Sequence, residues 1–302
     1  MHEQPPHSGS ANKDPRSGGT VNTIAKSKNK NKNVVIEFAC SPTSALGVVG
    51  SAGGFSVHRL SLDVADLTTD KGLKYAKAIV SDFPGCSLHG SLPCTPWTLW
   101  NFMNVAKYGE SFKQKLDKSR NKSIIMLSHF FLLAKDIIRY GGHVSFEWPR
   151  FSTGWALAKL QKWITKHHLL TVDFDGCSLG VKSRKGRPIK KPWRIVTTNP
   201  ELVRLLKPHR CKHDSSEHDP CAGADTKDTG FYTPELATIL LKGLTHVKAK
   251  PTKTNNNKHA SSKLVSPAAV VSPRSGGAGE EQARTPVVVE EPIQVTKIQK
   301  KP

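Results

Sequence analysis

Val34-Val35-Ile36-Glu37-Phe38-Ala39-Cys40 is a short run of apolar and β-branched residues. A run of this length and composition predicts a strand that is buried on both faces of a sheet. Ser41-Pro42-Thr43-Ser44 follows it and predicts a turn, and the residues from Ala45 to Gly50 predict a brief helix. A buried strand that leads directly into a helix is the repeating unit of an α/β fold.

The same alternation of strand and helix continues outward from this stretch. Further strands are predicted at residues 55–60, 86–92, 143–146, 169–174 and 193–197. Further helices are predicted at residues 72–80, 119–140, 153–168, 200–206 and 233–246. This alternation predicts an open, mostly parallel, Rossmann-like sheet with helices on both faces, in which ligands bind at the carboxyl ends of the strands.

The two ends of the chain differ in composition from this segment. Residues 1–33 contain few large apolar side chains, and residues 248–302 are rich in Lys, Pro, Ser and Val with no helical period. Neither end can bury enough apolar surface to offset its conformational entropy, so both are predicted to be disordered, basic tails. Residues 34–247 are therefore expected to form one domain with a substantial core.

The chain is strongly basic and carries a net charge of +21. The tails contribute +4 and +6, which leaves +11 on residues 34–247. A basic domain favours a nucleic-acid partner, and we expect DNA rather than RNA. The alternative is a surface whose charge only improves solubility.

No run of 18 apolar residues and no secretory signal is present in the sequence, so we expect no membrane partner. The six cysteines lack the close, even spacing of a disulfide framework and indicate reduced thiols. We therefore expect the protein to be intracellular, and nuclear rather than cytoplasmic. The sequence leaves its oligomeric state open.

Two strand ends carry groups suited to covalent chemistry. Cys94 follows Pro93 at the end of the strand 86–92, and Glu147 follows the strand 143–146. A thiol and a carboxyl at the ends of two strands of one sheet can share a cleft. This pair suits covalent attack on a heterocycle, with the thiolate as nucleophile and the carboxyl as proton donor.

The motifs around this pair resemble those of DNA (cytosine-5) methyltransferases. In chain order they are Phe38-Ala39-Cys40-Ser41-Pro42, Pro93-Cys94-Thr95, Phe146-Glu147-Trp148-Pro149 and Lys190-Lys191-Pro192-Trp193-Arg194-Ile195-Val196. The chain is also similar to a methyltransferase-like module of retroelement-type polyproteins from marine protists. The resemblance covers about residues 34–247 and implies a class I methyltransferase fold with S-adenosylmethionine as cofactor.

The resemblance also implies roles for individual residues. The implied catalytic residues are Cys94, which adds to carbon 6 of cytosine, Glu147, which contacts ring nitrogen 3 and the exocyclic amine, and Arg194, which supports the site. The implied cofactor-binding residues are Phe38 against the adenine, Cys40, Ser41 and Pro93 in the adjoining loops, and Asp63 or Asp66 near the ribose or adenine. The target base must leave the stack to reach such a pocket.

Structural roles are open for the same residues. Cys94 could be a small buried hydrophobe and Glu147 could cap a turn. Phe38 would be a core residue in most proteins, and Asp66 is better explained as a helix-cap residue. Arg194 could be an exposed edge residue or a phosphate contact.

A second cluster, within the loop 209–223, has the composition of a metal site. Cys211, His213, His218 and Cys221 supply two thiols and two imidazoles within eleven residues, and His209 is a possible substitute ligand. Four such ligands suit a structural zinc ion, because they leave no open position for catalysis. A polar loop with incidental ligands and an active-site lid are the alternatives.

The strongest nucleic-acid signal is the basic stretch 182–193. Its predicted contacts are Lys182, Arg184, Lys185, Arg187, Lys190 and Lys191 to phosphates and Trp193 to a base. A solvated hairpin loop or a localisation signal would explain the same residues.

Three hypotheses follow from these patterns. The first is a nucleic-acid methyltransferase, and the second is an inactive nucleic-acid-binding module of a mobile element with the same fold. The third is a zinc-stabilised interaction protein.

Overall fold

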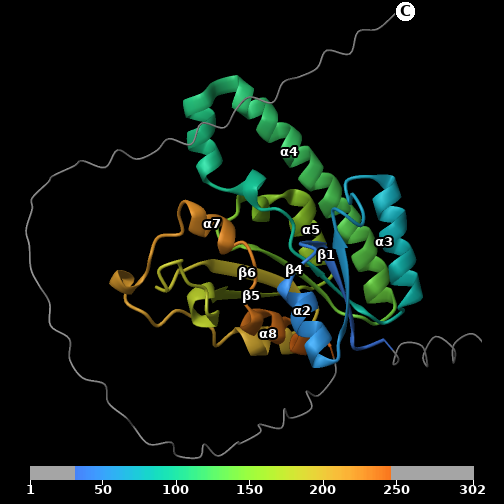
Figure 1. Cartoon of the computed structure of the whole chain (residues 1–302). Helices are drawn as coiled ribbons and strands as arrows, with labels where there is room; N and C mark the ends of the chain where they lie inside the picture. The colour runs from blue at the N-terminus through green and yellow to red at the C-terminus, as the bar shows by residue number, and fades with distance from the viewer. Residues whose placement is uncertain (1–30, 246–302) are drawn as a thin grey trace, which may run out of the picture. The chain divides into compact units, whose positions relative to one another are not determined.

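Six strands form one sheet in the order β2-β1-β3-β4-β6-β5 (Figure 1). The structure is a computed structural model that describes residues 31–245. The strands are β1 (Val34–Cys40), β2 (Ser56–Ser61), β3 (Ser87–Gly90), β4 (Val144–Pro149), β5 (Leu170–Asp175) and β6 (Pro192–Thr197). Residues 1–30 and 246–302, which hold nearly all of the predicted tails, lie outside the described residues.

The sheet is mixed rather than wholly parallel. β2, β1, β3 and β4 pair in parallel, whereas β6 pairs antiparallel with both β4 and β5. No helical crossover separates β5 from β6: a short 3-10 helix, η3 (Gly176–Leu179), and a loop closed by the Lys182–Pro188 bridge connect them. A connection of this kind returns the chain in the opposite direction. The predicted α/β class with a mostly parallel sheet is confirmed.

Helices cover both faces of the sheet (Figure 1). On one face lie α3 (Asp70–Asp82), α4 (Trp100–Arg139) and α5 (Ala158–Lys166), and on the other lie α2 (Ala45–Gly53), α6 (Pro200–Leu206) and α8 (Pro234–Leu244). The short helix α7 (Ala224–Asp228) lies outside these two layers and was not predicted. Among the described residues, no helix is long and apolar enough to span a membrane.

Two apolar clusters, one on each face, follow from the alternation of side chains along the strands. In β1, Ile36 and Phe38 join the cluster under α3, α4 and α5, while Val35 joins the cluster under α2, α6 and α8. In β4, Phe146 and Trp148 belong to the first cluster. Glu147, between them, therefore points to the second face.

The largest difference from the predicted elements is the start of α4. The sequence predicts a helix over residues 119–140, but α4 begins at Trp100 and bends at Gly109, whose φ is 65° and ψ is −153°. Glycine adopts this left-handed conformation without a Cβ clash. The first segment of α4 exposes apolar side chains instead of burying them on one face. Its sequence therefore has no amphipathic period from which a helix could be predicted.

Candidate active site

The strand order reverses at β1. β2 lies on one side of β1 and β3 on the other, and both are parallel to it. In open α/β sheets a crevice forms at the carboxyl ends of the strands where the order reverses in this way, and ligands bind there. The turn that follows β1 and the residues 91–94 that follow β3 border this crevice.

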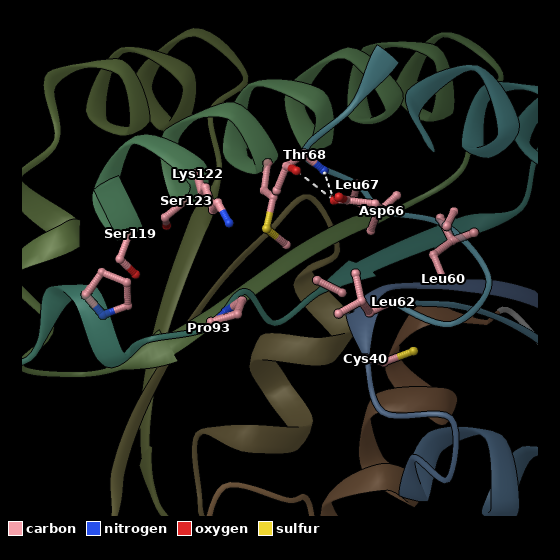
Figure 2. A pocket seen from close by; sticks show the side chains of 14 residues that line it. Cys40, Leu60, Leu62, Asp66, Leu67, Thr68, Pro93, Ser119, Lys122 and Ser123 are labelled. Carbon is pink, nitrogen blue, oxygen red and sulfur yellow. Dashed lines mark hydrogen bonds between the residues drawn. The ribbon is translucent and has the colours of Figure 1, made fainter. Parts of the chain in front are cut away.

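A cavity of about 460 Å³ lies at this edge of the sheet (Figure 2). Its volume falls in the usual range for small-molecule sites, about 300–1,000 Å³. The wall includes the apolar side chains Leu60, Leu62, Leu67 and Met126 and the polar side chains Asp66, Thr68 and Lys122. Three of the predicted cofactor-binding residues, Cys40, Asp66 and Pro93, line it.

Asp66 occupies a turn ahead of α3. Its Oδ1 accepts hydrogen bonds from the backbone N–H of Thr68 at 2.9 Å and from the Thr68 hydroxyl at 2.7 Å, as Figure 2 shows. These bonds hold the pKa of Asp66 below its ordinary value. The residue that caps α3 is Thr69, so Asp66 is a turn residue and not the helix cap. Asp63 is exposed and is not part of the cavity wall.

Phe38 has a different position from the one that the resemblance implies. Its side chain has no exposed surface, and its ring centroid lies 5.6 Å from that of Phe130 in the core. A fully enclosed ring cannot pack directly on an adenine. Leu62 and Met126, which are not fully enclosed, provide an apolar wall of the cavity instead.

A smaller cavity of about 120 Å³ adjoins the first. Ala39 and Cys40 line both cavities, and Ser41, Glu37 and Tyr232 also line the smaller one. Ala39 has a φ of 62°, a left-handed conformation at the bulge where β1 ends. Burial raises the pKa of Glu37 to about 7, against the lowering effects of its hydrogen bond from Ser44 and of the charge on Arg59.

Glu147 is the most constrained acid of the site. Its side chain is 4% exposed, and its Oε2 accepts hydrogen bonds of 2.9 Å from the hydroxyls of Ser91 and Tyr232. Its Oε1 is buried and has no hydrogen-bond partner among the described residues. Burial raises the pKa of Glu147, although the two hydrogen bonds and the charge of Lys191 oppose this rise. The carboxyl is thus held by one oxygen and leaves the other without a partner.

A chain of hydrogen bonds extends from Glu147 into the sheet. His89 Nε2 lies 3.0 Å from the Tyr232 hydroxyl, and His89 Nδ1 lies 2.7 Å from the Ser145 hydroxyl. Burial lowers the pKa of His89 to about 3, so its imidazole is neutral. Because the Tyr232 hydroxyl donates to Glu147, His89 Nε2–H is the donor to Tyr232, and Ser145 donates to His89 Nδ1. The network fixes the Tyr232 hydroxyl in the orientation that serves Glu147.

Sequence analysis missed Tyr232 and Ser91. Tyr232 lies 85 residues from Glu147 and reaches it from the segment that precedes α8. No local pattern marks it, because its hydroxyl matters only once the chain has returned to the sheet. Ser91 precedes the Pro93-Cys94 motif by two residues, and the strand alternation in that segment could have indicated it.

Cys94 lies at the start of the 3-10 helix η1 (Thr95–Trp97), next to the carboxyl ends of β3 and β4. Burial raises the pKa of its thiol, the negative charge of Glu147 raises it further, and the positive charge of Lys191 lowers it. Cys94, Glu147 and Lys191 are therefore close enough to influence one another electrostatically. At rest the thiol is protonated, and Lys191 is the group that favours its thiolate.

Cys94 opens onto a third cavity, of about 820 Å³, with aromatic walls. Trp100 and Phe151, which are 67% and 63% exposed, line it together with Lys191 and Lys227. Exposed aromatic rings beside lysines form the combination that binds bases and phosphates. Neither ring was predicted from the sequence as a site residue. Trp100 belongs to the first segment of α4, for which no helix was predicted.

Three of the six basic residues in the stretch 182–193 are engaged with the chain itself. Arg184 pairs with Asp228 at 2.7 Å and Arg187 with Asp219 at 3.1 Å, and the Lys191 ammonium donates to the carbonyl of Thr229. Exposed side chains without an ion pair among the described residues are Lys182, Lys185 and Lys190.

Trp193 is 2% exposed and belongs to the core. The prediction that Trp193 stacks on a base is therefore corrected: a buried ring has no free face. Lys191, two residues earlier, lines the third cavity, with its ammonium 5.4 Å from the Trp193 ring centroid.

Arg194 lies on the opposite face of the sheet from Glu147. Its Nε and Nη2 donate to Asp173 at 2.7 and 3.0 Å, and its guanidinium lies 5.9 Å from the ring centroid of Trp155. Arg150 also pairs with Asp173, at 3.1 Å. These contacts account for Arg194 as part of an ion-pair cluster between β5 and β6, and they do not bring it to Cys94.

A group of cysteines and histidines that could hold a metal ion is present, but its members differ from those predicted. The ligand atoms of Cys177, Cys211, His213 and His218 lie within 4.8 Å of one another. Cys221 is exposed, and its sulfur lies 3.3 Å from the Thr229 hydroxyl. Cys177 thus takes the place expected for Cys221, because η3 brings it next to the loop from 34 residues earlier in the chain.

No protein-family model matches the chain, and no curated protein matches it significantly.

Proposed function

We propose that this protein is an S-adenosylmethionine-dependent methyltransferase that acts on nucleic acid, with carbon 5 of cytosine as the target position. The proposal rests on the hydrogen bonding of the two carboxyl oxygens of Glu147. One of its oxygens accepts two hydrogen bonds, the other is buried without a partner among the described residues, and the carboxyl is close enough to Cys94 for its charge to raise the pKa of the thiol. Buried polar atoms in native proteins are nearly always paired, so an unpaired one indicates a position for a ligand atom.

The environment of Glu147 suits a proton donor. Burial favours the neutral carboxyl, and a neutral carboxyl carries one hydroxyl proton. Because Ser91 and Tyr232 already donate to Oε2, the proton belongs on Oε1. A ring nitrogen of a heterocycle placed at Oε1 would accept that proton in a hydrogen bond.

Cys94 supplies the nucleophile. Its thiol would first lose its proton to solvent, a loss that the charge of Lys191 favours. The thiolate would then form a bond to carbon 6 of cytosine while Glu147 transfers its proton to ring nitrogen 3, which makes carbon 5 nucleophilic. After methylation, carbon 5 loses its proton to solvent, the bond between sulfur and carbon 6 breaks, and the proton on nitrogen 3 returns to Glu147. The thiolate and the acid are both restored.

The cavity of about 460 Å³ is the place for the cofactor. Its apolar wall suits an adenine ring, and Asp66 retains Oδ2 free of hydrogen bonds among the described residues for a ribose or adenine donor. When bound, S-adenosylmethionine supplies the methyl group as an electrophile. Zinc, the second cofactor predicted from the sequence, has only a structural place in this proposal.

Trp100 and Phe151 provide the entrance for a nucleic acid. A base inside a duplex cannot reach Cys94, so the target base must be extruded or the substrate must be single-stranded. The exposed rings and the lysines of the third cavity offer stacking surfaces and positive charge for that strand. The exposed Lys182, Lys185 and Lys190 would add phosphate contacts.

A second candidate function is nucleic-acid binding without turnover. The observation that favours it is the turn after β1, where Cys40-Ser41-Pro42 stands and no glycine occurs before Gly47. A cofactor that approaches the backbone closely usually requires glycine there. The left-handed Ala39 supplies the unusual backbone conformation, but it retains a Cβ.

Two measurements on the full chain separate these functions. Calorimetric titration with S-adenosylmethionine and its demethylated product tests the cofactor cavity, and micromolar binding is expected. Incubation with an oligonucleotide that contains 5-fluorocytosine, in the presence of the cofactor, tests Cys94. Release of the product requires loss of a proton from carbon 5, and fluorine at that position cannot be removed in its place. The covalent adduct therefore accumulates, and the protein that carries it migrates more slowly under denaturing conditions.

The matched variants are Cys94→Ser, which should form no adduct, and Cys86→Ala, which removes a buried thiol outside the walls of the three cavities and should form it normally. If the folded wild-type protein did not bind the cofactor, the proposed methyltransferase function would be wrong. Salt-dependent nucleic-acid binding that persists in that case would establish the second candidate.

A further inference from the structure

The four ligand atoms of Cys177, Cys211, His213 and His218 converge on one point between two segments. Cys177 comes from η3, directly after β5, and the other three come from the loop that follows α6. A single thiol–imidazole hydrogen bond would account for one contact in this group. It would not account for the approach of two sulfurs and two ring nitrogens to within 4.8 Å of one another.

Two of the separations between the ligand atoms match those of a tetrahedral zinc site. The sulfur of Cys211 lies 3.3 Å from Nε2 of His218 and 3.6 Å from Nδ1 of His213. With bonds of about 2.3 Å from zinc to sulfur and about 2.0 Å from zinc to nitrogen, a tetrahedron places sulfur and nitrogen ligands roughly 3.5 Å apart.

Hydrogen bonds from surrounding groups also hold the ligands in place. His218 Nδ1 donates to the carbonyl of Asp214 at 3.0 Å, which leaves Nε2 as the nitrogen with a lone pair facing Cys211. The backbone N–H of Cys211 donates to Asp175 Oδ2 at 2.9 Å. Asp175 also receives the ion pair of Arg210 at 3.6 Å, and its own N–H donates to the carbonyl of His209 at 2.9 Å. Partners of this kind orient metal ligands in proteins.

We propose that Cys177, Cys211, His213 and His218 bind one zinc ion that fastens the loop of residues 209–230, the wall loop, to the end of β5. Four protein ligands leave no open position on the metal, so its role is structural. The proposal goes beyond the methyltransferase function and does not depend on it.

The wall loop connects this metal site to the candidate active site. Cys221, Thr226 and Lys227 of the wall loop line the cavity onto which Cys94 opens. The loop also receives the ammonium of Lys191 at the carbonyl of Thr229, and it leads directly into Tyr232, the hydrogen-bond donor to Glu147. Release of the metal is therefore expected to loosen one wall of that cavity and not the sheet.

Metal analysis of the purified full-length protein tests the site. We expect about one zinc ion per chain from elemental analysis after dialysis. Cys177→Ser and Cys211→Ser should each lose it, while Cys221→Ser, the matched control with an exposed thiol, should retain it. Cobalt substitution should give the visible absorption of a tetrahedral ion with sulfur-to-metal charge transfer, and this measurement on the unmutated chain avoids the risk that a variant fails to fold.

Hydrogen exchange in the presence and absence of a chelator tests the consequence. Exchange should rise in residues 209–230 and stay unchanged in β1 and β3. The proposal would be overturned by a folded protein without zinc that takes up no cobalt, by a disulfide between Cys177 and Cys211, or by zinc that is lost from Cys221→Ser and kept by Cys177→Ser. None of these results concerns cofactor binding or the Cys94 adduct.

Discussion

The hydroxyl of Tyr232 donates a 2.9 Å hydrogen bond to Oε2 of Glu147 and receives one from His89 Nε2. Both side chains are largely enclosed, and the bond joins the segment before α8 to the end of β4. Tyr232 and Ser91 both donate to Oε2, whereas Oε1 has no partner among the described residues and could accept a hydrogen bond from a ligand or donate one to it. The position of the acid is thus set by the two hydroxyls, of Ser91 and Tyr232, that donate to Oε2.

Tyr232→Phe should lower both stability and turnover. The change leaves His89 Nε2–H without its acceptor and Glu147 with one donor, and an unpaired buried group costs about 1–3 kcal/mol in the free energy of unfolding. Denaturant unfolding measures this loss. Tyr75→Phe, an exposed position on α3, is the control and should change neither quantity.

The pH profile distinguishes a positioning role for Tyr232 from a general loss of stability. Its hydrogen bond lowers the pKa of Glu147, so removal of the hydroxyl should raise that pKa further. Glu147 must be protonated to act as an acid, and the alkaline limit that it imposes on methylation should therefore move to higher pH in Tyr232→Phe. An unchanged limit would contradict the assignment of Glu147 as the acid.

The reactivity of Cys94 should respond in opposite directions to two substitutions. Lys191→Gln removes a positive charge that lowers the pKa of the thiol, so the pKa should rise and alkylation at neutral pH should slow. At pH values above the pKa of Glu147, where its carboxyl is ionised, Glu147→Gln removes a negative charge that raises the pKa of Cys94, so alkylation there should quicken. The rate of iodoacetamide labelling of the Cys94 peptide, followed by mass spectrometry against pH, checks both. A shift in the same direction for both variants would contradict the electrostatic account.

Trp100→Ala and Phe151→Ala should weaken binding of single-stranded DNA by about 1–3 kcal/mol for each stacked base that is lost. Both rings are more than half exposed, so the free energy of unfolding should hardly change. Fluorescence anisotropy with a labelled oligonucleotide gives the affinity. The control is Tyr75→Ala, an exposed aromatic residue away from the cavity wall, and equal losses in all three variants would argue against a specific stacking site.

Arg194→Gln tests whether Arg194 acts in the site or in the ion-pair cluster with Asp173. The paired guanidinium holds the pKa of Asp173 below its ordinary value of about 3.9. A depressed carboxyl pKa contributes stability that is present above the unfolded pKa and is lost as the pH falls through the folded one. The variant should therefore lose less stability than wild type as the pH falls below about 4.

The same variant should keep formation of the fluorocytosine adduct within a few-fold. Thermal unfolding between neutral and acidic pH, compared with wild type, gives the stability difference. Loss of the adduct with unchanged acid sensitivity would instead support the catalytic role that the resemblance implies for Arg194.

The sequence by itself determined most of the elements and the class of the fold. Buried strands such as Val34–Cys40 are continuous apolar runs, and their alternation with helices restricts the chain to a layered α/β arrangement. The neighbourhood of Cys94 and Glu147 could also be predicted, because the carboxyl ends of parallel strands meet at one edge of the sheet. Both inferences use local patterns and a topological rule.

The tertiary structure decided which side chains serve the site. Trp193 and Phe38 are apolar residues in promising motifs, yet packing encloses both, while Trp100 and Phe151 stay exposed beside Cys94. Cys177 replaces Cys221 in the metal group, and Tyr232 reaches Glu147 across 85 residues. Burial and long-range contact depend on how distant segments pack, and no local pattern in a single sequence encodes that packing.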